Sequence, residues 1–128
     1  MKIAVIIVRV LMGLMFLQAS LMFFLKMYPA QPEMSKDIMT YMNGLTIGHT
    51  LEIIKTIELL CSICFLAGRY VALAAVVLFP ITFNILIYHI MLDPGKMIVA
   101  ILIFAAHVFL LYAYRKNYAG MLNPRRIE

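Results

Sequence analysis

The chain of 128 residues has no tryptophan, two cysteines and few charged side chains. Charged residues make up 13% of it and apolar residues 65%, against about 25% and about 45–50% in soluble globular domains. A water-soluble domain this short could not bury so much apolar surface, because small domains bury the smallest share of what they expose. Large apolar and aromatic side chains are abundant instead: eleven Met, eight Phe and seven Tyr accompany the aliphatic residues. The composition therefore predicts a protein of the lipid bilayer.

Acidic residues are scarcer than basic ones, six against eleven, and the formal net charge is +5. A basic chain raises nucleic acid as a partner, but no basic stripe with interleaved exposed aromatics is present. Nine of the eleven Lys and Arg residues fall in loops, termini or span ends, where membrane topology and anionic lipid head groups account for them. We expect the bilayer as partner, and no nucleic acid.

Four apolar segments predict four transmembrane helices, at about 3–25, 50–66, 71–92 and 97–114. A spanning helix needs roughly 20 apolar residues, within about 17–25, so the second and fourth are short, and the second also carries charges. The first is longer than the apolar region of a signal peptide and no small-residue cleavage site follows, so we expect it to be retained. Tight turns at 68–69 and 93–96 make neighbouring helices antiparallel.

The first loop is long and contains a helix of another kind. Apolar residues recur at helical spacing over about 32–45, with charged residues opposite, which predicts a short amphipathic helix lying at the membrane interface. The predicted fold is all-α: an integral membrane bundle of four antiparallel transmembrane helices plus this interfacial helix, in one domain, 1–128. Orientation follows from the positive-inside rule, because six Lys and Arg lie on the side of the termini and three on the other. Both termini are expected in the cytoplasm.

Ionisable side chains inside the spans are candidates for function, because each costs roughly 2.5–3.5 kcal/mol to insert at the centre of a helix. The helical rise of about 1.5 Å per residue puts Glu58 and His107 near mid-membrane, and Arg9 roughly 9 Å from the inner end. The predicted intramembrane polar core is Arg9, Lys55, Glu58 and His107, with Lys55 competing for the Glu58 carboxylate at i,i+3 spacing. A proton-handling or ligand-anchoring site and a polar clasp that fixes helix register both remain open.

The third span contains a proline, which frees a backbone carbonyl and can kink a helix. Two interpretations stay open for the polar residues around it. One is a kinked helix with an interhelical hydrogen bond, and the other is a cavity that opens outward. The candidate cavity residues are Gln18, Thr82, Asn84, Tyr88 and His89.

Two weaker patterns lie on the second and third spans. His49 and Glu52, and likewise His89 and Asp93, share a helical face near the outer ends, and two His with two carboxylates could hold a divalent metal. Such residues are ordinary at interfaces, so we expect no metal there. The C-x-x-C sequence at 61–64 has the spacing of a thiol redox motif, but its apolar helix on the reducing side of the membrane favours simple packing.

Four short patterns carry a likeness to a known family. They are Arg9-x-x-x-Gly13-Leu14-x-Phe16, then Lys55-x-x-Glu58 followed by Leu66-Ala67-Gly68-Arg69, then Phe79-Pro80-Ile81-Thr82-x-Asn84-Ile85 followed by His89, and the closing Tyr114-Arg115-Lys116-Asn117-Tyr118. With these the chain resembles the DoxX-like membrane protein family over essentially its whole length. That family is named for a quinone-linked thiosulfate oxidation subunit, and other members look like partners of redox enzymes.

The resemblance implies a small bacterial inner-membrane protein linked to redox or quinone metabolism. The first hypothesis is an accessory or subunit protein, partnered by a membrane or peripheral redox protein or by a second copy of itself. The alternative is a quinone- or small-lipophile-binding oxidoreductase component; a small transporter is the third. No haem ligand pair or flavin motif is present in the sequence, so a bound quinone is the only cofactor that these hypotheses include. Whether the chain is an enzyme stays open.

Overall fold

A backbone in apolar surroundings must satisfy its hydrogen bonds internally, and this chain does so with helices. The computed structural model describes residues 1–27 and 34–125, and over these it contains five α-helices and no strand. The α-helices are α1 (Lys2–Phe24), α2 (Lys36–Ile47), α3 (Thr50–Ala67), α4 (Val71–Met91) and α5 (Met97–Ala113). Two short 3-10 helices, η1 (Pro94–Lys96) and η2 (Arg115–Tyr118), precede and follow α5. The all-α prediction is confirmed for this part of the chain.

Among the described residues, three helical stretches are long and apolar enough to cross a membrane: α1, α4 and the continuous run from Pro94 to Ala113. The helix α3 has 18 residues but carries three charged side chains, Glu52, Lys55 and Glu58. Those charges keep it from qualifying by length and composition alone. The structure therefore supports three of the four predicted spans. The length and composition of α3 do not by themselves support the span predicted at 50–66.

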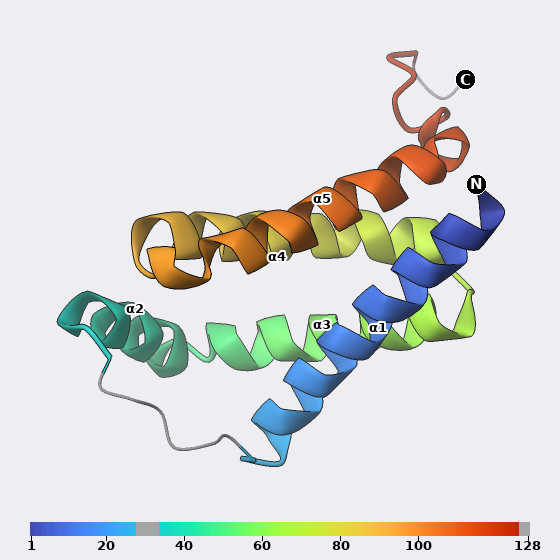
Figure 1. Cartoon of the computed structure of the whole chain (residues 1–128). Coiled ribbons are helices and arrows are strands. Elements are labelled where there is room, and N and C mark those ends of the chain that lie inside the picture. Colours follow the sequence, from blue (N-terminus) through green and yellow to red (C-terminus); the bar gives the residue numbers. More distant parts are fainter. Residues whose placement is uncertain (28–33, 126–128) are drawn as a thin grey trace.

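In Figure 1, α3, α4 and α5 lie alongside one another in alternating directions, and α1 crosses α3 obliquely. The helix α1 packs chiefly on α3, and α4 packs on both α3 and α5. Figure 1 places the start of α1, the turn between α3 and α4, and the end of α5 together, at what we call the terminal end. At the opposite end, which we call the α2 end, α2 lies beside the start of α3 and the turn that contains η1.

A small apolar core joins these helices, while much of the apolar surface faces outward. Its buried members include Met12 and Phe16 of α1, Phe65 of α3, Leu78 of α4 and Leu110 of α5. Large apolar side chains on the outer faces are well exposed, among them Leu11, Leu73, Ile98 and Leu102. Outward-facing aliphatic residues on long helices are suited to lipid tails, which are as apolar as leucine.

Glycine allows the closest approach between α1 and α3. A Cβ built on Gly13 would lie 2.9 Å from the Cγ of Leu66 and 3.2 Å from the Cβ of Phe65. Small residues at such crossings let helix backbones come together, which is a common source of packing energy in membranes. This contact fixes where α1 crosses α3.

The turn from α3 to α4 depends on a second glycine. Gly68 ends α3 with a φ of 72°, in the left-handed region that glycine adopts without strain. A Cβ here would lie 2.8 Å from the Nη1 of Arg9, so the Arg9 guanidinium covers this turn. The tight turn predicted at 68–69 is confirmed, and it reverses the chain so that α4 returns along α3.

The first loop holds the predicted amphipathic helix, a few residues later than expected. Its start is set by Ser35, whose Oγ accepts a hydrogen bond from the backbone N–H of Ile38 at 3.3 Å. The helix runs over Lys36–Ile47 in place of about 32–45, and residues 32 and 33 lie outside the described part of the chain. None of its residues is buried. It therefore lies on the outside of the bundle, in contact with α3.

Candidate functional site

A pocket of about 470 Å³ lies between α2, the first half of α3 and the second half of α4. Most of its wall is apolar, supplied by residues such as Leu45, Ile54 and Ile81. Its polar members are Tyr41, Lys55, Glu58, Asn84, Tyr88 and His89. This size and composition are typical of a site for a small molecule, in which a few polar groups orient an otherwise apolar ligand.

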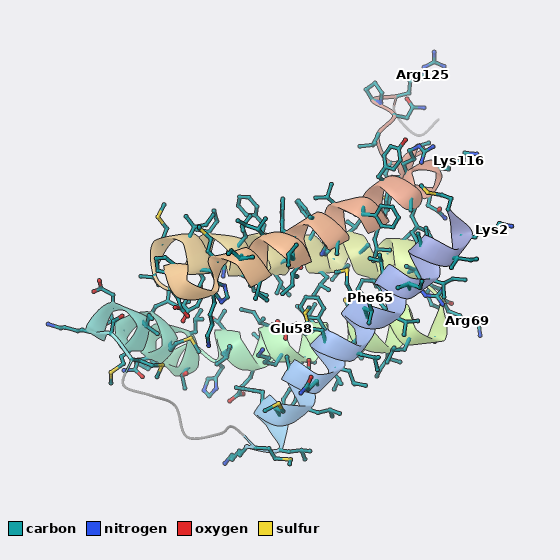
Figure 2. The ribbon with its side chains drawn as sticks, in the orientation of Figure 1. Lys2, Glu58, Phe65, Arg69, Lys116 and Arg125 are labelled. Atoms are coloured by element: carbon teal, nitrogen blue, oxygen red, sulfur yellow. The ribbon has the colours of Figure 1, made fainter. Side chains whose placement is uncertain are left out.

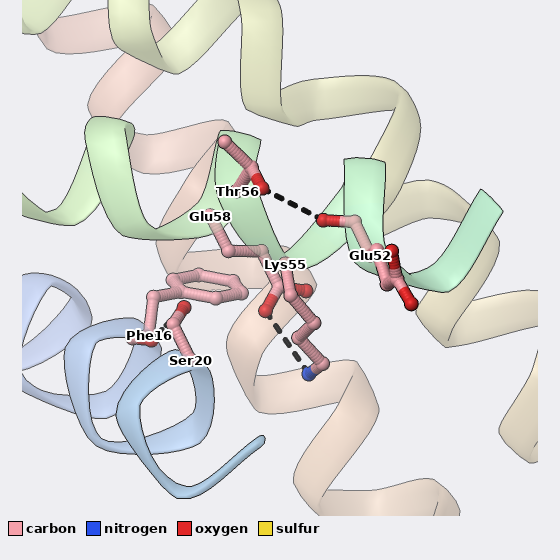
Figure 3. Close-up of polar contacts among 6 residues, drawn as sticks. All are labelled: Phe16, Ser20, Glu52, Lys55, Thr56 and Glu58. Atoms are coloured by element: carbon pink, nitrogen blue, oxygen red, sulfur yellow. Dashed lines mark hydrogen bonds and ion pairs between the residues drawn. The ribbon is translucent and has the colours of Figure 1, made fainter. Parts of the chain in front are cut away.

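One wall of the pocket contains an ion pair (Figure 3). The Nζ of Lys55 donates a hydrogen bond to the Oε2 of Glu58 at 3.1 Å. Their i,i+3 spacing puts both on one face of α3. The Glu58 side chain is 2% exposed and that of Lys55 is 19% exposed. Because an unpaired buried charge would be strongly destabilising, the two side chains hold each other at a fixed place in the wall.

Figure 3 also shows neighbouring polar side chains of α3 and α1 and their hydrogen bonds. The hydroxyl of Thr56 donates to the Glu52 carbonyl at 2.8 Å, and the buried hydroxyl of Ser20 donates to the Phe16 carbonyl at 2.7 Å. Both bonds stay within their own helices. They satisfy these hydroxyls locally, and leave the Lys55–Glu58 pair as the ionic feature of the pocket.

A hydrogen bond between side chains of α2 and α4 closes the pocket on another side. The Nδ2 of Asn84 donates to the hydroxyl oxygen of Tyr41 at 2.9 Å. The Tyr41 ring also packs against that of Tyr88, with centroids 5.3 Å apart. Because Tyr41 accepts from Asn84, its own hydroxyl proton stays available for a ligand. The two rings and the amide thus form a polar, aromatic side of the pocket.

His89 adds a ring nitrogen to this side. Its Nδ1 lies 2.8 Å from the backbone carbonyl oxygen of Ile85, and its ring packs edge-on against Tyr88 with centroids 5.0 Å apart. A carbonyl oxygen can only accept, so Nδ1 carries the proton of this bond. The Nε2 atom is then the one left for a further partner.

Two residues expected in this region form a clasp elsewhere. The fully buried His107 of α5 is bonded through Nδ1 to the Thr82 hydroxyl at 2.9 Å and through Nε2 to the Ala75 carbonyl at 2.7 Å. The carbonyl requires Nε2 to be the donor. Thr82 therefore faces α5 and not the pocket, and His107 ties α5 to α4. This clasp lies beside Pro80, where the helix lacks one backbone donor.

Arg9 lies away from Glu58. Its guanidinium covers Gly68 at the terminal end, ten residues after Glu58, which is roughly 15 Å along a helix. Its Nε is buried without a hydrogen-bond partner. Ion pairs within residues 1–27 and 34–125 are Lys55–Glu58 and His49–Glu52. The structure thus brings Lys55 to Glu58 and does not bring Arg9 and His107 to them.

The candidate metal ligands are not gathered. His49 and Glu52 are exposed and lie 3.5 Å apart, while His89 turns Nδ1 to its own helix. Within the described ranges no group of three or more His, Cys, Asp or Glu could hold a metal ion. Asp93 precedes η1 and completes no such group.

Gln18 and the cysteines also lie outside the pocket. Gln18 is exposed on α1, in a separate apolar depression with Leu14 and Leu17. Cys61 and Cys64 are free, and Cys61 belongs to the core between the helices. Of the five predicted cavity residues, Asn84, Tyr88 and His89 line the pocket.

Sequence reasoning did not find the contribution of α2 to this site. Tyr41, Met42 and Leu45 form the apolar face of the amphipathic helix, and that face was expected to lie at the membrane interface. In the structure the same face lines the pocket. The signal that could have found it is the tyrosine within an apolar stripe, since a tyrosine that packs on apolar surface usually finds a polar partner for its hydroxyl.

Comparison of the chain with family models, with curated proteins and with solved structures finds no match in any of the three. The likeness to the DoxX-like family stays a prediction from the four sequence patterns given above.

Proposed function

We propose that this chain is a four-helix inner-membrane protein that binds a small lipophilic molecule with a polar head, such as a quinone, in the pocket between α2, α3 and α4. The observation that carries the proposal is the Lys55–Glu58 ion pair, buried in the wall of a pocket of about 470 Å³. Ionisable residues inside a membrane helix bundle are costly to insert, and for that reason they mark a functional site more often than apolar residues do.

In this proposal α3 is the fourth span. Two observations support it: α3 packs on both α1 and α4, and Glu58 is neutralised by Lys55 rather than facing lipid. Glu52 lies in the first turn, where a charge can reach the interface. Four spans then put both termini on one side, and the excess of Lys and Arg at the terminal end favours the cytoplasm for that side.

The chemistry of the pocket favours a ligand that accepts hydrogen bonds at one end. Lys55 and the Tyr41 hydroxyl are donors, and the Tyr41 and Tyr88 rings offer flat surfaces to a ring. Quinone carbonyls are acceptors on a flat ring with an apolar tail, and the tail would extend along apolar walls towards the bilayer.

The resemblance to DoxX-like proteins would give this binding its context, as an accessory or subunit protein of membrane redox metabolism. The chain needs no redox centre of its own for that role. It would hold the lipophile close to a partner protein that carries out the electron transfer.

The test is binding of a short-chain ubiquinone to the purified protein in detergent, by titration, together with solvent extraction and mass analysis of any lipophile that co-purifies. Glu58→Gln is expected to bind at least about tenfold more weakly, because the neutral amide no longer holds the Lys55 ammonium in the pocket wall, and the hydrogen bond from that charged group to the ligand contributes about 1.5–3 kcal/mol. Glu52→Gln removes a carboxylate from the same helix outside the pocket and is expected to bind as the original protein does.

Circular dichroism of each variant checks that its helices are intact. Equal affinity of the folded Glu58→Gln variant and the original protein would contradict the proposal, and so would equal losses in the Glu58→Gln and Glu52→Gln variants.

A further inference from the structure

A second pocket, of about 570 Å³, lies at the terminal end between the start of α1 and the end of α5. We call it the basic pocket. Its lining includes Lys2, Val5 and Ile6 from α1, and Ala113, Tyr114, Arg115 and Lys116 from the end of α5 and the start of η2. It is separate from the proposed lipophile site, which opens at the other end of the bundle.

The charges of the basic pocket have one sign. Lys2, Arg115 and Lys116 are cations, and the lining contains no acidic residue. Figure 2 shows two more cations, Arg69 and Arg125, at the same end of the bundle. The acidic residues of the described part of the chain all lie in α2, in the first half of α3 or in the turn after α4: Asp37, Glu52, Glu58 and Asp93. The terminal end therefore carries a concentrated positive potential.

The structure holds this basic end in place. Arg115 lies over the ring of Tyr112, 4.2 Å from its centroid, and its Nη1 donates to the Tyr112 carbonyl at 2.9 Å. The hydroxyl of Tyr118 donates to the Ala72 carbonyl at 2.8 Å, which fastens η2 to the start of α4. Burial of this hydroxyl raises the pKa of Tyr118, so it stays a neutral donor at physiological pH. Arg115 and Lys116 are thus presented on a fastened segment.

The pocket combines these cations with an apolar wall. Val5, Ile6 and Ala113 lie beside Lys2 and Lys116, and neither lysine has an ion-pair partner within residues 1–27 and 34–125. A ligand that satisfies both parts has an anionic group joined to hydrocarbon. Basic pockets between transmembrane helices on the cytoplasmic side are suited to lipid head groups. Each basic side chain near the surface strengthens the binding of an anionic lipid.

We propose that the basic pocket binds the phosphate of an anionic phospholipid. Lys2 and Lys116 contact the phosphate oxygens, Arg115 adds charge, and the first acyl carbons lie on Val5, Ile6 and Ala113. The site rests on the proposed insertion of the helices in a membrane and does not depend on a ligand in the other pocket.

The experiment measures phospholipid binding to the purified protein, freed of co-purified lipid, by native mass spectrometry. The probes are phosphatidylglycerol, phosphatidylcholine with the same acyl chains, and inorganic phosphate. We expect phosphatidylglycerol to bind about tenfold or more tightly than phosphatidylcholine. The double variant Lys2→Gln and Lys116→Gln is expected to lose that preference, because each basic residue near the surface attracts the anionic lipid.

A matched control removes two exposed lysines at the α2 end, with Lys36→Gln and Lys96→Gln, and is expected to keep the preference. Equal binding of the two lipids, or equal losses in the two double variants, would overturn the site. Inorganic phosphate binding as tightly as phosphatidylglycerol would also overturn it, because the site would then recognise free phosphate. Glu58→Gln should bind phosphatidylglycerol normally, so a failure of the lipophile proposal is distinguishable from a failure here.

Discussion

At the scale of single residues, the most consequential contact is the one between Lys55 and Glu58. The carboxylate of Glu58 is almost fully covered, and its hydrogen-bond partner is one turn earlier on the same helix. A pair of this kind is strongly coupled: removal of one partner leaves an uncompensated charge, whereas replacement of both by apolar residues can be neutral.

The first prediction follows from that coupling. Lys55→Met should lower the free energy of unfolding by about 3 kcal/mol, because Glu58 loses its counter-charge. The double variant Lys55→Met and Glu58→Leu should recover much of this loss. The measurement is thermal unfolding in detergent followed by circular dichroism, with the exposed Lys36→Met as control. A double variant no more stable than Lys55→Met would contradict the prediction.

His107 shows why a buried polar residue in a span need not belong to the ligand site. Both of its ring nitrogens are occupied by Thr82 and Ala75 of the neighbouring helix. Interhelical hydrogen bonds of this kind stabilise membrane bundles by about 0.6 kcal/mol on average and up to about 2 kcal/mol. Of the two interpretations that the sequence left open, this geometry favours the polar clasp for His107.

At the scale of elements, the crossing of α1 and α3 is controlled by a single missing side chain. Gly13 faces Leu66 and Phe65 at distances that leave no room for a larger residue. Gly44 of α2, in contrast, has nothing within 4 Å of a Cβ built on it.

These two glycines make a matched pair for the second prediction. Gly13→Leu should lower the free energy of unfolding by about 1–3 kcal/mol, because overpacking displaces α1 from α3. Gly44→Leu should leave it unchanged or raise it, since leucine favours helix over glycine by up to about 1 kcal/mol. Thermal unfolding in detergent measures both. If Gly44→Leu cost as much as Gly13→Leu, the close approach would not be the cause.

The third prediction concerns α2, which no buried residue attaches to the bundle. Its contacts with α4 include the Asn84–Tyr41 hydrogen bond. Tyr41→Phe should therefore increase deuterium uptake by amides of 36–47 and leave those of α4 and α5 unchanged, because weakly packed elements open first. Tyr112→Phe, which removes a hydroxyl far from α2, is the control. Unchanged uptake across 36–47 in Tyr41→Phe would count against this view of α2.

At the scale of the whole molecule, the number of spans decides which side of the membrane each end of the bundle faces. With four spans, Lys36 and Lys116 lie on opposite sides. If α3 did not cross, α4 and α5 would be inverted, and the two residues would lie on the same side. The charge distribution, with cations at the terminal end and every described acidic residue elsewhere, favours the first arrangement.

This dependence of sidedness on the number of spans gives the fourth prediction. In a background with Cys61→Ser and Cys64→Ser, Lys36→Cys should react with a membrane-impermeant maleimide on intact spheroplasts. Lys116→Cys should react only after the membrane is permeabilised. Modification of both residues from the outside would mean that α3 does not span.

The sequence by itself determined the local structure of this protein. Hydrophobic runs set the helices to within a residue or two, as with the prediction 71–92 for α4, observed over Val71–Met91. The Lys55–Glu58 pair was also predictable, because an i,i+3 contact needs only the geometry of one helix. The length and charge of α3 did not decide whether it spans the membrane, since charged residues are tolerated there only when other helices cover them.

Tertiary structure alone decided which distant residues meet. Tyr41 bonds to Asn84 across 43 positions, and Arg9 covers Gly68 and not Glu58. Periodicity gives the face of a helix on which a residue lies, but not the rotation and offset at which that helix packs on its neighbours. Those are set by close contacts such as Gly13 against Leu66, where steric fit selects one register among many that the apolar pattern permits.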